Sequence, residues 1–405
     1  MLSPPNKNPP AVAAAEGLTS SDSGRGLIDK DMVPDQYRQR RFRAQRVIAK
    51  TLRMHAKKNS PTRYPGDVWR VVDCLWCRIG TVQVYRSAQH NRAHYKGLQT
   101  CGSVWTCPCC ASKIEERRRK EVQTVFDWAA SKGLDSSMLT NTFPHGMGDD
   151  LKELFAGQAR ALKLFRDDRT YRREMKAIGN VGLIRTLEIT HGASGWHPHT
   201  HEVKFHREEL TQEDANWIRH KLVEPWRNAC IKAGLLTNET EELAFYRHAL
   251  DMKAGFTAGD YLQKTDSEKT WTPAHEISKA SSKAGRRSGK HPFALAVDGV
   301  PGFSELLVEY AQATKGKRKL YFSPGLKAKA GVDELTDEQI AQLDEDRAVR
   351  IANVNSAWSF IQRTDADHNT RARVLEAAEE NGRDGISDLL WNLGFDPYST
   401  SFAED

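Results

Sequence analysis

The chain has no long apolar segment. Its 405 residues have a mean hydropathy of −0.64. A helix needs about 20 consecutive apolar residues to cross a bilayer, so no membrane-spanning segment is predicted. The N-terminal residues also lack a basic stretch followed by an apolar run, so no secretory signal is predicted. We therefore expect a cytoplasmic protein with no membrane partner.

Cysteine is nearly absent outside one short stretch, since six of the seven cysteines lie between Cys74 and Cys110. Disulfides are rare in a reducing compartment, so this clustering predicts metal ligation. Cys74 with Cys77 and Cys107 with Cys110 form two C-x2-C pairs, the spacing of a tetrahedral Zn²⁺ site. Four thiolates leave no open coordination position, which predicts a structural role. Cys101 is a rival ligand, and buried free thiols are the alternative to a metal site.

Three segments lack acidic residues but are rich in lysine and arginine. Residues 36–58 carry nine basic side chains and suit a solvated helix or a helix on a phosphate backbone about equally. Residues 277–291 carry five, and residues 315–329 carry six. The net charge of +7 is modest, but clustered cations favour a polyanionic partner. The predicted DNA contacts are Arg286, Arg287, Lys317, Arg318 and Lys319.

The centre of the chain combines aliphatic strand-forming residues with alternating histidines. Residues 181–190 predict a buried strand, and residues 199–205 predict the returning strand of a hairpin. Because residues i and i+2 of a strand share a face, His199 and His201 are expected to project side by side. The hairpin can bring Glu188 opposite them. Two imidazoles and one carboxylate suit a divalent cation that keeps positions open for water or a phosphate oxygen.

The order of predicted elements around this hairpin is strand, helix, strand, strand, helix, strand, helix. That order predicts an α+β core, in which an antiparallel sheet has helices on one face and leaves the other face for a ligand. The predicted segments are a disordered tail (1–35), a basic helix with the cysteine module (36–135), the core (136–275), a basic DNA-contacting extension (276–330) and a helical C-terminal tail (331–405).

Tyr261 and Lys264 follow the last predicted strand and lie one helical turn apart. A tyrosine hydroxyl can attack a phosphodiester covalently, and a lysine together with a cation can stabilise the phenolate and the pentavalent phosphate. Spacing alone favours a structural tyrosine beside a solvated lysine. Tyr246, Tyr310 and Tyr321 are the competing phenols.

Several segments, in order along the chain, resemble plasmid rolling-circle replication initiators of the HUH (His-hydrophobic-His) endonuclease superfamily. The similarity runs from about Cys74 to Leu326. The segments that carry it are the metal motif at 185–201, the first motif at 138–142, the nucleophile motif at 261–265, the cysteine segment at 101–114 and a following segment at 319–326.

This resemblance implies a metal-dependent, site-specific single-strand DNA endonuclease and strand transferase. Tyr261 would join the 5′ phosphate at a plasmid origin with help from Lys264, and the freed 3′-hydroxyl would prime leading-strand synthesis. Mg²⁺ or Mn²⁺ would be held by Glu188, His199 and His201, with His197 as a second choice. The implied partners are supercoiled origin DNA with a single-stranded loop, a host helicase and a polymerase.

The sequence departs from the family pattern at two positions. Thr200 fills the usual hydrophobic place between the histidines, where it points away from the metal. Thr257 stands where some relatives carry a glutamate that terminates replication, and the adjacent Asp260 faces differently. The rival class is a zinc-containing DNA-binding regulator with an inactive nuclease core, while a relaxase or a single-strand transposase would use the same chemistry.

Overall fold

The computed structural model describes residues 34–59, 69–88, 91–236, 245–246, 248–258, 289–343 and 348–397. The predicted residues Tyr261, Lys264, Arg286 and Arg287 lie outside these ranges, as does almost all of the predicted tail at 1–35. Within the described ranges, no helix combines the length and apolar character that a bilayer crossing requires.

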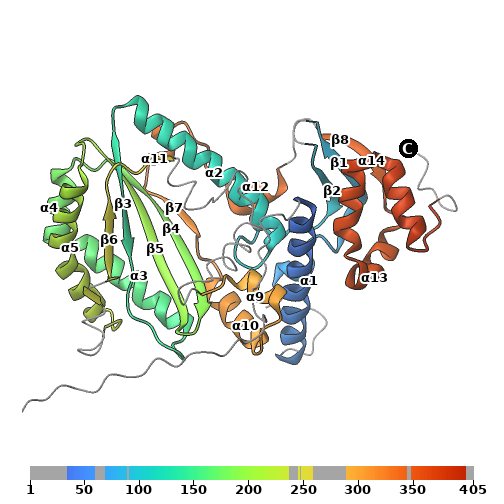
Figure 1. Cartoon of the computed structure of the whole chain (residues 1–405), viewed down its shortest axis with the longest axis horizontal. Helices are drawn as coiled ribbons and strands as arrows, with labels where there is room; N and C mark the ends of the chain where they lie inside the picture. Colours follow the sequence, from blue (N-terminus) through green and yellow to red (C-terminus); the bar gives the residue numbers. More distant parts are fainter. Residues whose placement is uncertain are drawn as a thin grey trace, which may run out of the picture.

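A five-stranded antiparallel sheet forms one half of the molecule (Figure 1). The strand order is β6-β3-β5-β4-β7, and every neighbouring pair is antiparallel. This confirms the predicted antiparallel sheet and places β5 at its centre. The strands are β3 (Asp135–Asn141), β4 (Gly182–Gly192), β5 (Gly195–His206), β6 (Leu250–Lys253) and β7 (Leu320–Phe322).

One face of this sheet is covered by α3 (Leu151–Asp167), α4 (Arg169–Ala177) and α5 (Gln212–Lys232) (Figure 1). On that face Glu202 of β5 binds Arg166 of α3, and Lys204 donates a 2.8 Å hydrogen bond to the Tyr171 hydroxyl of α4. We call it the back face of the sheet and the opposite one the front face.

The helices described within the predicted core thus lie on one face, but the prediction that the other face is left free is wrong, because a helix from the preceding segment covers part of it. α2 (Pro108–Ser131) crosses it, and Phe126 packs on Phe205 with ring centroids 5.2 Å apart. Val203 and Phe205 make this part of the face apolar, and the apolar stripe of α2 buries it. The covered part is the half of β5 that follows the histidines.

A second, three-stranded sheet joins residues that lie far apart in the sequence (Figure 1). Its order is β2-β1-β8, with β1 (Arg78–Ser87), β2 (Ala93–Leu98) and β8 (Ala348–Asn353). α13 (Trp358–His368) and α14 (Thr370–Asn392) pack on it around a shared apolar cluster. The C-terminal region is helical as predicted, but it also supplies β8. The predicted segment boundaries stay predictions.

The basic helix α1 (Pro34–Asn59) uses arginines inside the protein. Arg38 binds Glu379 of α14, and Arg46 donates a 2.9 Å hydrogen bond to the buried carboxylate of Asp365 in α13. These arginines therefore hold α1 against the C-terminal helices. Shorter helices in the described ranges are η1 (Arg70–Val72), α9 (Pro292–Asp298), α10 (Phe303–Thr314), α11 (Leu326–Lys329) and α12 (Asp337–Gln342).

Candidate functional site

The β4–β5 hairpin places a carboxylate and two histidines together on the front face. Glu188 lies directly opposite His199 in the strand register, which confirms the pairing expected from strand periodicity. The Glu188 Oε2 atom is 3.0 Å from Nε2 of His199 and 3.6 Å from Nε2 of His201. The three candidate ligand atoms all lie within 4.8 Å of one another. This group could hold one metal ion.

The neighbouring strand orients one of these imidazoles. Thr140 of β3 lies opposite His201, and its hydroxyl oxygen is 2.9 Å from the His201 Nδ1 atom. Such a hydrogen bond fixes the ring and leaves Nε2 for a ligand. Burial opposes ionisation of Glu188, but hydrogen bonds from His199 and His201 outweigh it and hold the Glu188 pKa well below its ordinary value. The carboxylate is therefore ionised at neutral pH, as a metal ligand requires.

Two more histidines, His145 and His197, lie beside His199 on the same face of the sheet. His145, in the loop after β3, contacts Nδ1 of His197 through its Nε2 atom, and the His197 and His199 ring centroids are 4.9 Å apart. Burial, with additional effects of His199 and His145, lowers the pKa of His197 to about 3. His197 is thus neutral, and it lies outside the three-residue group. No sequence pattern around His145 predicted that it would lie near this site. Only the folding of the loop brings it there.

A glycine allows this loop to approach the hairpin. Gly195 has φ +80, and a Cβ atom built there would lie only 2.6 Å from the carbonyl oxygen of Gly146. A larger residue would therefore push away the loop that carries His145.

The chain returns to the front face immediately before the predicted nucleophile. The amide of Phe256 donates a 2.9 Å hydrogen bond to the carbonyl of Ser136 in β3, and Phe256 is buried in the front-face cluster with α2. Ala258 packs against the same cluster. Tyr261 follows three residues later in the sequence, outside the described ranges.

The competing phenols lie elsewhere. Tyr321 of β7 pairs with Arg185, three residues before Glu188, so the alternation of the strand places Tyr321 on the back face. Tyr310 is fully buried and stacks on Trp196 with ring centroids 5.9 Å apart. The Tyr246 hydroxyl donates to Glu224 of α5, a back-face helix.

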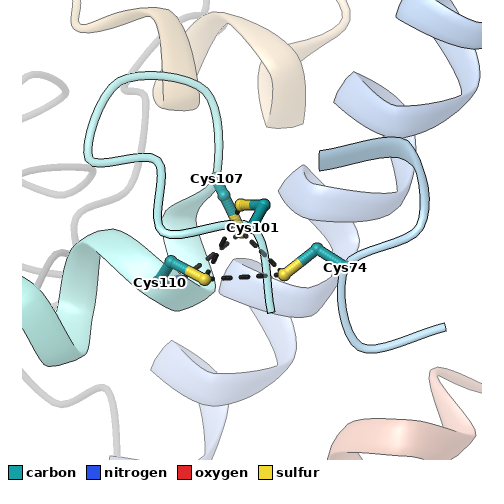
Figure 2. A group of neighbouring side chains, drawn as sticks. All are labelled: Cys74, Cys101, Cys107 and Cys110. Carbon is teal, nitrogen blue, oxygen red and sulfur yellow. Dashed lines mark hydrogen bonds between the residues drawn. The ribbon is translucent and has the colours of Figure 1, made fainter. Parts of the chain in front are cut away.

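Four cysteine side chains meet in a buried group beside α1 (Figure 2). The sulfur of Cys74 is 3.5 Å from that of Cys110 and 3.6 Å from that of Cys107, and Cys101 is 3.7 Å from Cys110. The backbone amides of Ser103 and Cys110 point at the sulfurs of Cys101 and Cys107, each at 3.4 Å. Amide donors favour thiolates, and four buried sulfurs at these distances could hold Zn²⁺.

The structure changes one member of the predicted cysteine set. Cys77 is partly exposed, and its thiol donates a 3.4 Å hydrogen bond to the carboxylate of Asp73 instead of joining the group. Cys101, the rival ligand, takes its place. The helical turn that starts α2 presents Cys107 and Cys110 together, whereas the turn after η1 separates Cys74 from Cys77.

Of the predicted DNA contacts in the described ranges, Lys317 and Arg318 are exposed. Lys319 is instead mostly buried, pairs with Glu115 of α2 and lies over the ring of Trp105. Its charge therefore serves the packing of α2 in this structure.

Comparison with known proteins gives one informative similarity. No family model matches the chain, and no solved structure matches it. Among curated proteins, the chain is similar to "Protein rep" of Streptomyces lividans, with 26% identity over 366 residues. The similar region covers 72% of this chain and 77% of that protein, so it extends far beyond the metal motif.

Proposed function

We propose that this protein initiates rolling-circle replication of a plasmid by cutting one strand at the origin with a tyrosine nucleophile, as an HUH endonuclease. The observation that carries the proposal is the group of Glu188, His199 and His201 on the front face of an antiparallel sheet. The similarity to Protein rep supports replication as the process. Each element of the reaction has a candidate residue.

The donor set fits a divalent cation. One carboxylate oxygen and two imidazole nitrogens lie within 4.8 Å, and Thr140 holds His201 in a ligating orientation. Imidazole donors suit Mn²⁺ better than Mg²⁺, which prefers oxygen ligands. The cation would supply Lewis acidity, polarising the scissile phosphate.

Tyr261 is the proposed nucleophile. Its phenolate oxygen forms a bond to phosphorus, the bond from phosphorus to the 3′ oxygen breaks, and the proton lost by the phenol is balanced by the one the 3′ oxygen gains. Lys264 would stabilise the developing negative charge. Support comes from the chain path, since Phe256 and Ala258 return to the front face, whereas Tyr246, Tyr310 and Tyr321 contact the back side.

The proposed DNA contacts are the exposed Lys317 and Arg318 together with Arg286 and Arg287. The partners are a supercoiled origin with a single-stranded loop, a host helicase and a polymerase, and the compartment is the cytoplasm. Thr257 is exposed in the described chain and cannot act as the terminating carboxylate, so termination would use another group.

The direct test incubates the protein with supercoiled origin plasmid and Mn²⁺ or Mg²⁺. We expect relaxed circles that remain covalently attached to protein after denaturation with detergent. A metal hydrolase would release free 5′ phosphate ends without an adduct. A DNA-binding regulator would retard the plasmid without cutting it, and either result would contradict the proposal.

We further propose that Cys74, Cys101, Cys107 and Cys110 bind one structural Zn²⁺. The expected result is that Cys101→Ser loses zinc and has a lower thermal midpoint, because a structural zinc contributes folding free energy directly. Cys77→Ser is the matched control, since Cys77 lies outside the group, and it should keep both. Elemental analysis and thermal unfolding measure the two properties. Zinc loss in Cys77→Ser with retention in Cys101→Ser would restore the ligand set predicted from spacing.

A further inference from the structure

The three-stranded sheet has two chemically different faces. On its inner face, Val84 and Ala352 are buried against α13 and α14, and Tyr95 meets Trp358 with ring centroids 5.3 Å apart. Neighbouring residues of a strand point to opposite faces, so the residues between them form an outer face. The register places these in two rows across the three strands: Lys96, Gln83 and Asn353 in one, and His94, Tyr85 and Arg350 in the other. The β1–β8 register shifts by one residue between Val84 and Tyr85, so Arg350 lies opposite Tyr85 although it is only two residues from Ala352.

The outer face, defined by these six residues, combines aromatic, cationic and amide groups. It contains no carboxylate, and each of its side chains is at least partly exposed. The rings of Tyr85 and His94 are stacked neighbours, with centroids 6.1 Å apart and planes 25° apart. The Lys96 ammonium lies 4.3 Å from the centre of the Tyr85 ring, and the guanidinium of Arg350 extends the row on the far strand.

We propose that this outer face binds single-stranded DNA, with unpaired bases stacked on Tyr85 and His94 and with phosphates contacted by Lys96 and Arg350. A base has a flat π surface, so it can stack on an aromatic side chain of a sheet whatever its identity. None of the six side chains that define the face is a carboxylate, so none of them repels a phosphate. The amides of Gln83 and Asn353 can pair with base edges.

A single strand fits this surface better than a duplex. In a duplex the base faces are stacked on each other and cannot reach a ring on a sheet. Duplex binding depends mainly on many phosphate contacts, but this face carries only two cations beside its histidine. The inference rests on the proposed function, in which strand cutting at an origin exposes unpaired DNA.

The first test measures binding of the full-length protein to a labelled dT oligonucleotide by fluorescence anisotropy. Tyr85→Thr keeps a residue that favours strands but removes the ring, and we expect about tenfold weaker binding. Tyr85→Phe keeps the ring and should bind like the parent protein. Trp217→Ala is the matched control, because Trp217 is an exposed aromatic on α5 with the Lys221 ammonium 2.8 Å from its ring centre, but lies outside the sheet.

Two further measurements separate stacking from charge. Lys96→Gln should reduce the salt dependence of binding by about 0.7 in the slope of log K against log salt, the value for one phosphate contact on a single strand. Photocrosslinking with an oligonucleotide containing 5-iododeoxyuridine should label Tyr85 or His94, and mass spectrometry would identify the peptide.

Several results would overturn the inference. Unchanged dT binding by Tyr85→Thr is one, and an equal loss of duplex and single-strand binding is another. If Tyr85→Thr is thermally destabilised, the crosslink decides, because labels found only outside the outer face contradict it. A failure of the proposed function would give a different result. In that case the protein would form no covalent adduct with origin DNA but would still bind dT through Tyr85.

Discussion

Tyr261→Phe is expected to abolish the covalent adduct with origin DNA while leaving plasmid binding and zinc content intact. The substitution keeps the aromatic ring but removes the oxygen that would attack phosphorus. Loss of a covalent nucleophile costs roughly 10⁴-fold or more in rate, so the adduct should fall below detection. A labelled single-stranded origin oligonucleotide and a denaturing gel measure the adduct directly.

The reverse reaction provides a second readout of the same chemistry. The phosphotyrosine ester keeps the energy of the broken bond, so the parent protein should also rejoin strands when a 3′-hydroxyl is supplied. Tyr261→Phe should lose both cutting and joining. Lys264→Ala should slow adduct formation by about 100-fold without eliminating it, because the cation still stabilises the developing charge.

Tyr321→Phe is the matched control for the nucleophile. Tyr321 lies beside the exposed Lys317 and Arg318 in the sequence, but its strand places it on the back face. The variant should form the adduct at the parent rate. An adduct peptide containing Tyr321, or full nicking by Tyr261→Phe with free 5′ phosphate ends, would contradict the mechanism.

His199→Ala and His201→Ala are each expected to abolish nicking, because each removes one of the three proposed protein ligands to the cation. Removing a group that hydrogen-bonds to a metal ligand already costs roughly 10- to 100-fold in metal affinity, so loss of a ligand itself should weaken Mn²⁺ binding by about 100-fold or more. Electron paramagnetic resonance of free Mn²⁺ measures that affinity without reference to activity. Duplex binding should change little, since neither histidine belongs to the basic segments.

Glu188→Ala should weaken Mn²⁺ binding similarly and shift the preference between Mn²⁺ and Mg²⁺, because it removes the only oxygen donor of the group. His220→Ala is a suitable control, as His220 is an exposed histidine on α5, which covers the back face. Nicking at the parent rate by both His199→Ala and His201→Ala in the presence of EDTA would show that the metal assignment is wrong.

Local patterns in the sequence were sufficient to predict that Glu188, His199 and His201 meet on one face of the sheet. Strand alternation depends only on backbone geometry, so it places His199 and His201 on one face whatever the rest of the chain does. A short hairpin connection then determines the register, and the structure pairs Glu188 with His199 as expected. Tyr261, by contrast, stays a prediction that rests on its motif and on the chain path up to Ala258.

Contacts between distant segments were decided only by tertiary structure. Cys101 rather than Cys77 joins the four-cysteine group, because the chain turns after Cys74 leave Cys77 beside Asp73. Lys319 forms an ion pair with Glu115, which lies 204 positions earlier in the sequence. One lysine of the basic segment at 315–329 therefore lies inside the protein instead of facing solvent.

Which helix covers which face of a sheet was also decided by contacts between distant segments. The apolar residues of α2 recur at helical spacing, but this periodicity does not say which surface the helix buries, since apolar burial is non-directional and favours any partner of suitable shape. Its position on the front face beside Phe205, and the pairing of β8 with β1, arise when the whole chain packs its apolar surfaces together. The sequence alone thus determined which side chains each strand carries, and packing between distant segments determined which parts of the sheets are covered by helices.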